Sequence, residues 1–367
     1  MFDVAVIGAG LAGLTCAQQL HQAGYSVVVV EKSRGVGGRV ATRRLNDTHA
    51  DHGVRYLEPQ GKLLQQLIER LLQRGILQGW TDTIYELKPS KSESVITSDS
   101  HPVLLTPHPP QFTRYVAPGG ITAVAKFLAT GLEIWFNRRV QMMTPTTEQT
   151  WHLTLDSTDK APTELTAGAV VVAIPAPQAL MLLKPLAESG LSPDFLDTLH
   201  SVEFDPCLSV MAGYSVDCPV PTWKACTLSK DSDLAWIGLD SSKRPDAQIP
   251  IFVLQSTAEF AKRYLDAEDL NPAAEQLLSH AAKKLLIPWL ETPDWFQVHR
   301  WRYAFPSRFL NQDYLDAGAA LPLVCCGDWC GGNLIESAMN SGLAAAVEIN
   351  SQLKKRSLPT EQFLSTL

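Results

Sequence analysis

Apolar residues at the start of the chain form two continuous runs separated by a stretch with helical spacing. Residues 3–7 (DVAVI) and 26–30 (SVVVV) are rich in β-branched side chains, which is typical of short buried strands. Residues 11–23 place apolar side chains at the spacing of one helix face, and Gly24 is a typical helix stop. This order of strand, helix and strand predicts a βαβ unit in a parallel sheet covered on both faces.

The rest of the chain contains further segments with the apolar spacing of helices or of strands. Further helices are predicted at 60–75, 120–129, 272–286 and 334–353, and further strands at 132–143, 151–155, 169–174, 208–214, 234–239, 251–255, 296–303 and 321–326. Strand-like runs dominate after residue 204, so we expect a second, largely antiparallel sheet there. Residues 88–110 are rich in Pro, Ser and Thr, which predicts either a mobile excursion, able to act as a lid, or a loosely formed hairpin.

Composition narrows the classes of protein that this pattern fits. The chain has 367 residues, 45% of them hydrophobic and 19% charged, with a formal net charge of −7 and no long basic run. These values favour a soluble globular protein and argue against nucleic acid or an anionic membrane as the main partner. The sequence contains no apolar run long enough to span a bilayer.

The cysteines favour a reducing compartment. There are seven, an odd count without the spacing of a disulfide framework, so we expect a cytoplasmic location. Cys325, Cys326 and Cys330 lie close together, but no second Cys or His pair follows at metal-ligand spacing. Small buried residues beside a turn are the favoured interpretation, and we expect no metal site.

A G-x-G-x-x-G pattern lies directly between the first predicted strand and the first predicted helix. In such a turn Gly8 permits the tight bend, Gly10 lets the backbone approach a pyrophosphate, and Gly13 lets the helix lie close to the strand. The start of the helix offers free N–H groups to the phosphates. Glu31 ends the second strand, where a carboxylate accepts ribose hydroxyls and disfavours a 2′-phosphate. The pattern predicts FAD or NAD, and a chance glycine turn is the weaker alternative.

A basic, glycine-containing segment follows the ribose-binding acid. In residues 35–44 (GVGGRVATRR), two adjacent glycines precede Arg39, so backbone N–H groups and one guanidinium can curl onto a diphosphate. Arg43, Arg44 and Arg55 add positive charge nearby. A solvated basic loop is the alternative interpretation.

Residues 6–39 (VIGAG to VGGR) resemble the amino-terminal motif of the FAD-dependent amine oxidase and phytoene desaturase superfamily, in which GGR touches the flavin side of the cofactor. Residues 327–345 look like its carboxy-terminal flavin motif. This resemblance implies that Asp328 holds a ribityl hydroxyl and that the amides of Leu334 and Ile335 face the flavin N1–C2=O edge, where a helix amino terminus stabilises negative charge. An ordinary helix-capping acid is the alternative for Asp328. Two motifs at opposite ends of the chain make non-covalent FAD the expected cofactor.

Further segments resemble the renalase family, especially its bacterial branch. They are VGGRVATRR (36–44), DHGVRY (51–56), VAPGGITAVAKFLA (116–129), VVVAIPAPQAL (170–180), LAWIGLDSSKRP (234–245), HRWRYAFP (299–306) and CGDWCGGNLIESAMNSGLAAA (326–346). The resemblance spans nearly the whole chain, and HRWRYA and GDWCGG are its more specific parts. It implies an α/β FAD-binding Rossmann-type domain, glutathione-reductase-like, with an α+β substrate domain built on a mostly antiparallel sheet. The expected FAD-binding domain is 1–60, 112–180 and 318–367, and the expected substrate domain is 61–111 and 181–317.

The renalase resemblance also implies a reaction. Bacterial members oxidise the 2- and 6-dihydro isomers of reduced nicotinamide dinucleotides to NAD(P)+, with hydride going to flavin N5 and O2 taking the electrons to give H2O2. Little acid–base machinery is then needed, because aromatisation of the nicotinamide drives the reaction. Amine oxidases of the superfamily usually place a lysine near N5, whereas residues 207–214 contain none. Lys243 is interpreted as a surface turn residue.

The expected site residues fall into two groups. The cofactor-binding group is Gly8, Ala9, Gly10, Leu11, Ala12, Gly13, Glu31, Lys32, Gly38, Arg39, Gly53, Val54, Arg55, Val140, Gly327, Asp328, Leu334, Ile335 and Ser341. The substrate-lining group is Arg55, Tyr56, Trp301, Tyr303 and Trp329. Aromatic rings can stack on a planar substrate and an arginine can bind a phosphate. Core packing is an equal alternative for Trp301 and Tyr303, whose alternate positions on a strand place them on one face, and His299 is interpreted as a strand residue rather than a base.

Three functions remain open from the sequence. The first is an oxidase of isomeric dihydronicotinamide dinucleotides, with O2 as its second substrate. The second is an amine oxidase or a carotenoid-type desaturase, although a desaturase should carry an apolar membrane-docking surface. The third is a flavin-binding protein without turnover. We expect a monomer or a homodimer.

Overall fold

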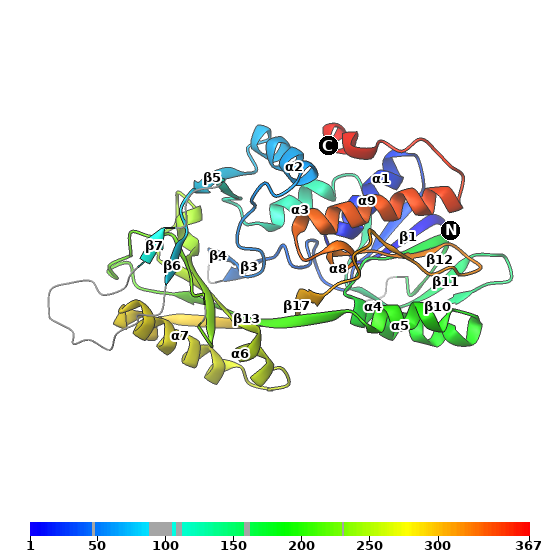
Figure 1. Ribbon diagram of the computed structural model, residues 1–367. Coiled ribbons are helices and arrows are strands. Elements are labelled where there is room, and N and C mark those ends of the chain that lie inside the picture. Colours follow the sequence, from blue (N-terminus) through cyan, green and yellow to red (C-terminus); the bar gives the residue numbers. More distant parts are fainter. Residues whose placement is uncertain (46–47, 88–104, 108–111, 158–161, 230) are drawn as a thin grey trace.

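The computed structural model describes residues 1–45, 48–87, 105–107, 112–157, 162–229 and 231–367. Two lobes, each built on a large sheet, are joined by long strands (Figure 1). Most of the predicted excursion at 88–110 lies outside the described residues. The strand before it, β6 (Tyr85–Leu87), pairs antiparallel with β7 (Leu105–Pro107), which lies within it.

The first sheet has a parallel centre, as the continuous valine runs predict. Its parallel strands, in spatial order, are β9 (Glu133–Trp135), β2 (Val27–Val30), β1 (Phe2–Ile7), β12 (Glu164–Val172) and β19 (Leu323–Cys325). Antiparallel strands extend it at β10 (Arg138–Pro145), β11 (Trp151–Ser157) and β18 (Leu315–Asp316). Side chains of β1 and β2 alternate between two separate buried cores, so both faces need a helical cover.

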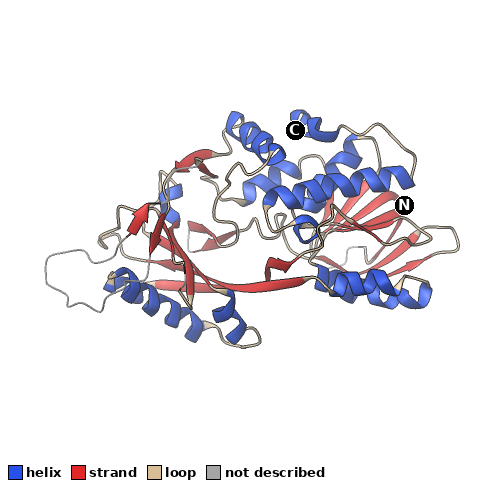
Figure 2. Cartoon of the chain, in the orientation of Figure 1, coloured by secondary structure: helices blue, strands red, loops and turns tan. Residues whose placement is uncertain are grey.

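Helices cover both faces of this sheet (Figure 2). On one face lie α1 (Leu11–Gln22), α2 (Lys62–Gln73), α3 (Thr122–Leu128) and α9 (Ile335–Gln352), and on the other lie α4 (Ala176–Leu183) and α5 (Pro193–His200). The parallel strands β1, β2, β12 and β19 end at one edge, where open α/β sheets bind ligands.

The second sheet is antiparallel apart from its β14–β6 pair, which confirms the prediction of a second, largely antiparallel sheet. Its order is β17 (Trp295–Arg308), β13 (Glu203–Gly213), β16 (Ile251–Ser256), β15 (Leu234–Leu239), β14 (Ala225–Thr227), β6 and β7. Helix α7 (Asn271–Leu285) and α6 (Ala258–Arg263) pack their apolar residues on one face. The other face is turned toward the first lobe and receives the short hairpin β3 (Thr42–Leu45) and β4 (Thr48–Asp51).

One predicted strand differs from the structure. The strand predicted at 132–143 is split into β9 and β10, because Asn137 adopts a left-handed φ of 54° between them. The expected domain division stays a prediction, although α2 and α5 both fall in the segments assigned to the substrate domain and pack their apolar residues in the cores of the first sheet. A two-stranded pair, β5 (Gln78–Thr81) with β8 (Arg114–Val116), lies beside α2.

Among the helices that the structure describes, none combines the length and the apolar character needed to cross a bilayer. Within the same residues, no cluster of His, Cys, Asp and Glu side chains is arranged to hold a metal ion.

Candidate functional site

The glycine turn after β1 combines two steric requirements with one open position. Gly8 has φ of +106°, and a Cβ there would lie 2.6 Å from the Ala173 carbonyl oxygen. A Cβ at Gly13 would lie 2.1 Å from the Gly8 carbonyl oxygen, so α1 can approach β1 only without a side chain. A Cβ at Gly10, in contrast, would meet no protein atom within 4 Å. The fold therefore requires Gly8 and Gly13, whereas Gly10 leaves space for a ligand, as a dinucleotide turn should.

Glu31 lies at the end of β2, facing this turn. The residue is 8% exposed, and its carboxylate accepts the N–H groups of Ala9 (2.8 Å) and Ser33 (2.8 Å). The following glycine segment folds back over the turn, because a Cβ on Gly38 would lie only 3.5 Å from the Gly10 Cα. The two sequence motifs thus form one backbone cradle. Of the other predicted cofactor residues, Lys32 is exposed, and Leu11, Ala12 and Val140 are buried in the cores of the first sheet.

An ion pair connects the two ends of the chain. The guanidinium of Arg39 donates to both carboxylate oxygens of Asp328, at 2.8 and 2.6 Å, and also to the Ala304 carbonyl oxygen at 3.0 Å. Asp328 begins α8 (Asp328–Gly331), the single turn that follows β19. The sequence predicted a cofactor contact for each residue, and the structure places the two side chains in direct contact with one another.

The amino terminus of α9 is open. Leu334, the N-cap residue, is 46% exposed, and its side chain does not cap the first N–H groups of the helix. A helix start of this kind stabilises a developing negative charge. Ser341 has a different place from the one expected: it is 1% exposed and accepts the Gly327 N–H at 3.0 Å, so it braces α8 against α9.

The sequence left open which face of β17 carries Trp301 and Tyr303. Trp301 shares the face of His299 and is turned toward the first lobe, since Phe296 and Val298 on the opposite face pack with the core around α7. Tyr303 lies beyond a register shift in the pairing of β17 with β13. The indole N–H of Trp301 donates to the His52 carbonyl oxygen at 2.9 Å, beside Gly53. The ring of Tyr303 lies 5.7 Å from that of Phe204, which is beneath Arg39.

Trp329 does not join this group. It is 1% exposed, packs in the core of the first sheet, and donates its indole N–H to the Ile174 carbonyl oxygen at 3.1 Å. Its position under Gly327, where a Cβ would lie 2.4 Å from the indole nitrogen, directs the ring inward. The expectation that Trp329 lines the substrate pocket was therefore wrong.

Arg55 and Tyr56 lie in an aromatic cluster between the lobes. Arg55 donates from Nε to Gln255 Oε1 at 2.6 Å, and its guanidinium lies 4.5 Å from the centre of the Trp236 ring. Tyr56 lies 5.9 Å from Trp236 and 6.2 Å from Trp80. A groove of about 350 Å³ opens beside Tyr56, lined by Glu58, Gln60, Ile84, Phe112, Arg114 and Thr227. Sequence reasoning missed Trp80 and Trp236, which line a small cavity together with Arg55, and Gln255, its hydrogen-bond partner.

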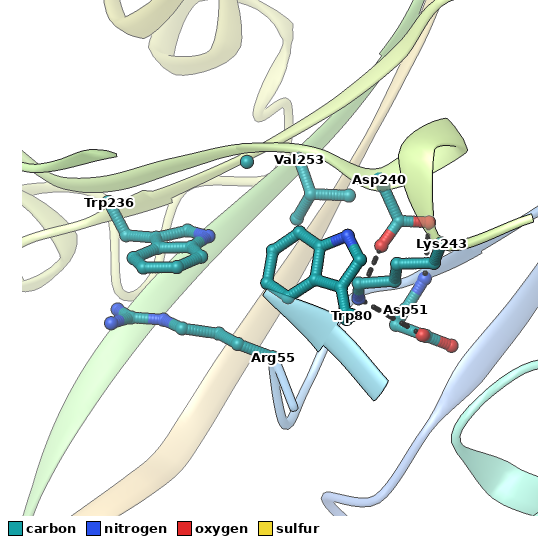
Figure 3. A pocket seen from close by; sticks show the side chains of 8 residues that line it. Asp51, Arg55, Trp80, Trp236, Asp240, Lys243 and Val253 are labelled. Atoms are coloured by element: carbon teal, nitrogen blue, oxygen red, sulfur yellow. Dashed lines mark hydrogen bonds and ion pairs between the residues drawn. The ribbon is translucent and has the colours of Figure 1, made fainter. Parts of the chain in front are cut away.

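Behind Arg55 lies a group of buried charges that the sequence did not reveal. Lys243 was expected at a surface turn, but it is 4% exposed and contacts Asp240 at 2.6 Å and Asp51 at 3.1 Å (Figure 3). Arg244 contacts the second oxygen of Asp240 at 2.7 Å. Burial raises the pKa of Asp240, but Lys243 and Arg244 outweigh that effect and leave the pKa below its ordinary value. Local sequence could not show this, because the partner Asp51 lies in the other lobe.

Two neutral histidines lie beside Trp301. Burial, together with the charges of His299 and Arg43, lowers the pKa of His52 to about 3, and burial and Arg43 lower the pKa of His299 to about 4. Their rings are 4.8 Å apart, and Nδ1 of His52 is buried without a hydrogen-bond partner. At neutral pH both imidazoles are uncharged.

Comparison with known proteins supports this assembly. A family model described as flavin containing amine oxidoreductase matches residues 78–350, and an NAD(P)-binding Rossmann-like domain matches residues 6–71. An L-amino-acid oxidase of Crotalus adamanteus is 40% identical over 67 residues, 18% of this chain and 13% of that protein. The chain therefore aligns with only a small part of this relative.

Two solved structures share the fold at low sequence identity. Putrescine oxidase bound to putrescine has a TM-score of 0.66 at 15% identity, covering 95% of this chain and 99% of that chain. Cyclohexylamine oxidase from Brevibacterium oxydans has a TM-score of 0.66 at 16% identity, covering 96% and 99%.

The open position at Gly10, the acid at the end of β2 and the uncapped start of α9 fit a flavin dinucleotide, and the match to the family model covers more than half of the chain. The cofactor is non-covalently bound FAD. The chain belongs to the flavin-containing amine oxidoreductase family and is an FAD-dependent oxidoreductase.

Proposed function

We propose that this protein is a renalase-like oxidase whose substrate carries an anionic group, namely an isomeric dihydronicotinamide dinucleotide of the 2- or 6-dihydro type. The observation that carries the proposal is the charge of Arg55. Its Nε hydrogen bond goes to a neutral amide, and its guanidinium lies against Trp236. A half-buried guanidinium without a carboxylate partner is suited to a diphosphate and unsuited to a cationic amine.

The surrounding charges support an anionic substrate. Asp51 and Asp240 are already matched by Lys243 and Arg244, and Glu58 lies 3.4 Å from Arg114. Among the residues that the structure describes, no carboxylate forms an ion pair with Arg55. A protonated amine placed beside this pocket would meet an uncompensated positive charge, and two like charges repel strongly where water is partly excluded.

Each part of the chain has a separate role in this proposal. The glycine cradle and Glu31 hold the adenosine diphosphate part of the cofactor, and Arg39, Asp328 and the start of α9 hold its flavin part. When bound there, FAD would supply the hydride acceptor and the route for the electrons to O2. Arg55 binds the substrate diphosphate, while Tyr56 and Trp236 provide flat surfaces for a planar ring.

The opening strand of the substrate lobe also supports the proposal. Strand β13 has the sequence EFDPCLSVMAG and contains no lysine, the residue that amine oxidases of the superfamily usually place near N5. Oxidation of a dihydronicotinamide needs no base on the protein, because loss of hydride restores an aromatic ring. We also propose a cytoplasmic location, which the seven free cysteines support.

The test is aerobic turnover with a panel of donors. We expect H2O2 formation with 2- and 6-dihydro-NAD(P) and none above background with putrescine, cyclohexylamine or an L-amino acid. Arg55→Met should raise KM for the dinucleotide by about tenfold or more, because a hydrogen bond to a charged group is lost, and should change kcat little. Turnover of an amine, with none of the dinucleotides, would identify the protein as an amine oxidase.

A further inference from the structure

The buried charges behind Arg55 have no part in the proposed reaction and need a separate explanation. Asp51 ends β4 in the first lobe, whereas Asp240, Lys243 and Arg244 belong to the turn after β15 in the second lobe. The side chains of all four are 4% exposed or less. We call these four residues the charge cluster. Burying four ionised groups is costly unless each is paired, so their retention calls for a function or a close fit.

The charge cluster is balanced across the two lobes. One oxygen of Asp51 accepts from Thr42 Oγ1 (2.7 Å) and from the Ile121 N–H (2.9 Å), both in the first lobe. Its other oxygen accepts from Lys243 at 3.1 Å. Lys243 also donates to one oxygen of Asp240, and the other oxygen of Asp240 accepts from Arg244. Two carboxylates thus face two cations, and no net charge is left over inside the cluster.

Arg55 adjoins the cluster through a very small enclosed space. Asp51, Asp240, Lys243 and Arg55 all line a cavity of about 10 Å³ that Trp80 and Trp236 close. This volume admits at most one water molecule, and Arg55 borders it together with three residues of the charge cluster. Figure 3 nevertheless shows the Arg55 side chain extended beneath Trp236, away from Asp51 and Asp240. Because Lys243 already binds both carboxylates, Arg55 has no unpaired acid to turn toward.

We propose that Lys243 is a positioning residue, which occupies the two buried carboxylates and thereby keeps the Arg55 guanidinium free for an anionic group of the substrate. The proposal rests on the proposed function only in that Arg55 binds a substrate anion. Without the ammonium group, the cluster would hold two carboxylates and one guanidinium. The excess negative charge would then draw Arg55 across the small cavity and away from the substrate side.

The experiment measures the affinity of the FAD-loaded protein for inorganic pyrophosphate by calorimetry. Lys243→Met keeps the length of the side chain and removes its charge, and we expect pyrophosphate binding to weaken by about tenfold or more, toward the value of Arg55→Met. The double variant Lys243→Met with Asp240→Asn restores charge balance and should recover the affinity to within a factor of about three. Lys262→Met, which removes an exposed lysine paired with Asp205, is the matched control and should leave the affinity unchanged.

Three results would overturn the positioning role. Lys243→Met could bind pyrophosphate as tightly as the unmodified protein, or the balanced double variant could stay as weak as the single one. If Lys243→Met fails to fold, Asp240→Asn gives the answer: the proposal expects unchanged or tighter binding, and a loss of affinity contradicts it. Unchanged binding by Arg55→Met would instead reject the anion site of the proposed function, which is a distinguishable failure.

Discussion

At the scale of single residues, Arg39 and Asp328 bring together motifs that lie at opposite ends of the chain. Asp328 has 6% of its side chain exposed and receives both arms of the guanidinium. Two parallel charge-assisted bonds fix the angle as well as the distance between the groups. The sequence predicted that each would serve the cofactor, and residue patterns alone could not show that they contact one another.

Asp328→Ala should therefore weaken FAD binding by about 2 kcal/mol or more, because it leaves the Arg39 charge without its partner and removes the acceptor at the start of α8. Flavin content is measured from the visible absorbance of the purified protein, and affinity by titration of the apoprotein with FAD. Asp313→Ala, at an exposed position nearby, is the control. Full flavin occupancy in Asp328→Ala would show that the pair has no part in holding the cofactor.

Two glycines of one turn should respond oppositely to the same substitution. Gly13→Ala places a Cβ 2.1 Å from the Gly8 carbonyl oxygen, so we expect the free energy of unfolding of the apoprotein to fall by about 1–3 kcal/mol. Gly10→Ala meets no protein atom and should change that free energy by less than about 1 kcal/mol, yet it should abolish FAD binding. Urea unfolding of the apoprotein and FAD titration separate the two effects. Normal FAD affinity in Gly10→Ala would mean that no phosphate lies at that position.

His52 and His299 predict a loss of stability in mild acid. The pKa of His52 is about 3 and that of His299 about 4, both below the ordinary value of 6.5. In mild acid the unfolded chain therefore binds protons at these two residues that the folded chain does not bind. Stability is therefore complete above about pH 6.5 and falls as the pH drops toward 4, by up to about 1.4 kcal/mol per pH unit for each group. Urea unfolding at pH 7 and pH 5 measures the slope. His52→Gln and His299→Gln should each flatten it, exposed His200→Gln should not, and an unchanged slope in the first two would contradict the account.

At the scale of elements, one acid connects two helix starts. Glu336 lies in the first turn of α9, and its carboxylate accepts the N–H groups of Leu63 (3.1 Å) and Leu64 (2.6 Å) at the start of α2. Gly61 makes room for it, since a Cβ there would lie 2.3 Å from the carboxylate carbon. Capping of this kind satisfies N–H groups that have no partner within their own helix. Helix α2 is thereby tied to α9, the helix whose start we propose as part of the flavin site.

Glu336→Ala should lower the free energy of unfolding by about 1 kcal/mol, the usual cost of a lost N-terminal cap. Chemical denaturation provides the measurement. Glu69→Ala, at an exposed position on α2 itself, is the matched control and should stay within about 0.5 kcal/mol of the unmodified protein. Equal stability of the two variants would show that α2 does not depend on this contact.

The predicted elements also show which signals a sequence carries. The valine runs of β1 and β2 and the long amphipathic pattern of α7 were predicted close to their observed bounds, because their burial follows the local period. The β3–β4 hairpin was not predicted, since its polar residues pair with each other and only Leu45 and Ala50 reach a core in the other lobe. Short helices such as α4 and α5 offer too few turns for a periodic signal.

At the scale of the whole molecule, the candidate site lies where the carboxyl ends of the first sheet meet the inner face of the second. The cofactor side of this junction could be predicted, because glycine turns and strand-ending acids are recognised from the spacing of residues that lie close together in the sequence. The substrate side could not, because Trp80, Trp236 and Gln255 reach Arg55 only after the two lobes have packed. Lys243 shows the same limit, since its carboxylate partners come from separate segments.

The most direct test of the account is the flavin spectrum of the purified protein under anaerobic conditions. We predict that 6-dihydro-NAD(P) bleaches the flavin absorbance within one turnover, that admitting air restores it with formation of H2O2, and that putrescine and cyclohexylamine leave it unchanged. A flavin that stays oxidised with the dinucleotide, and is bleached by an amine, would contradict the assignment of an anionic dihydronicotinamide substrate.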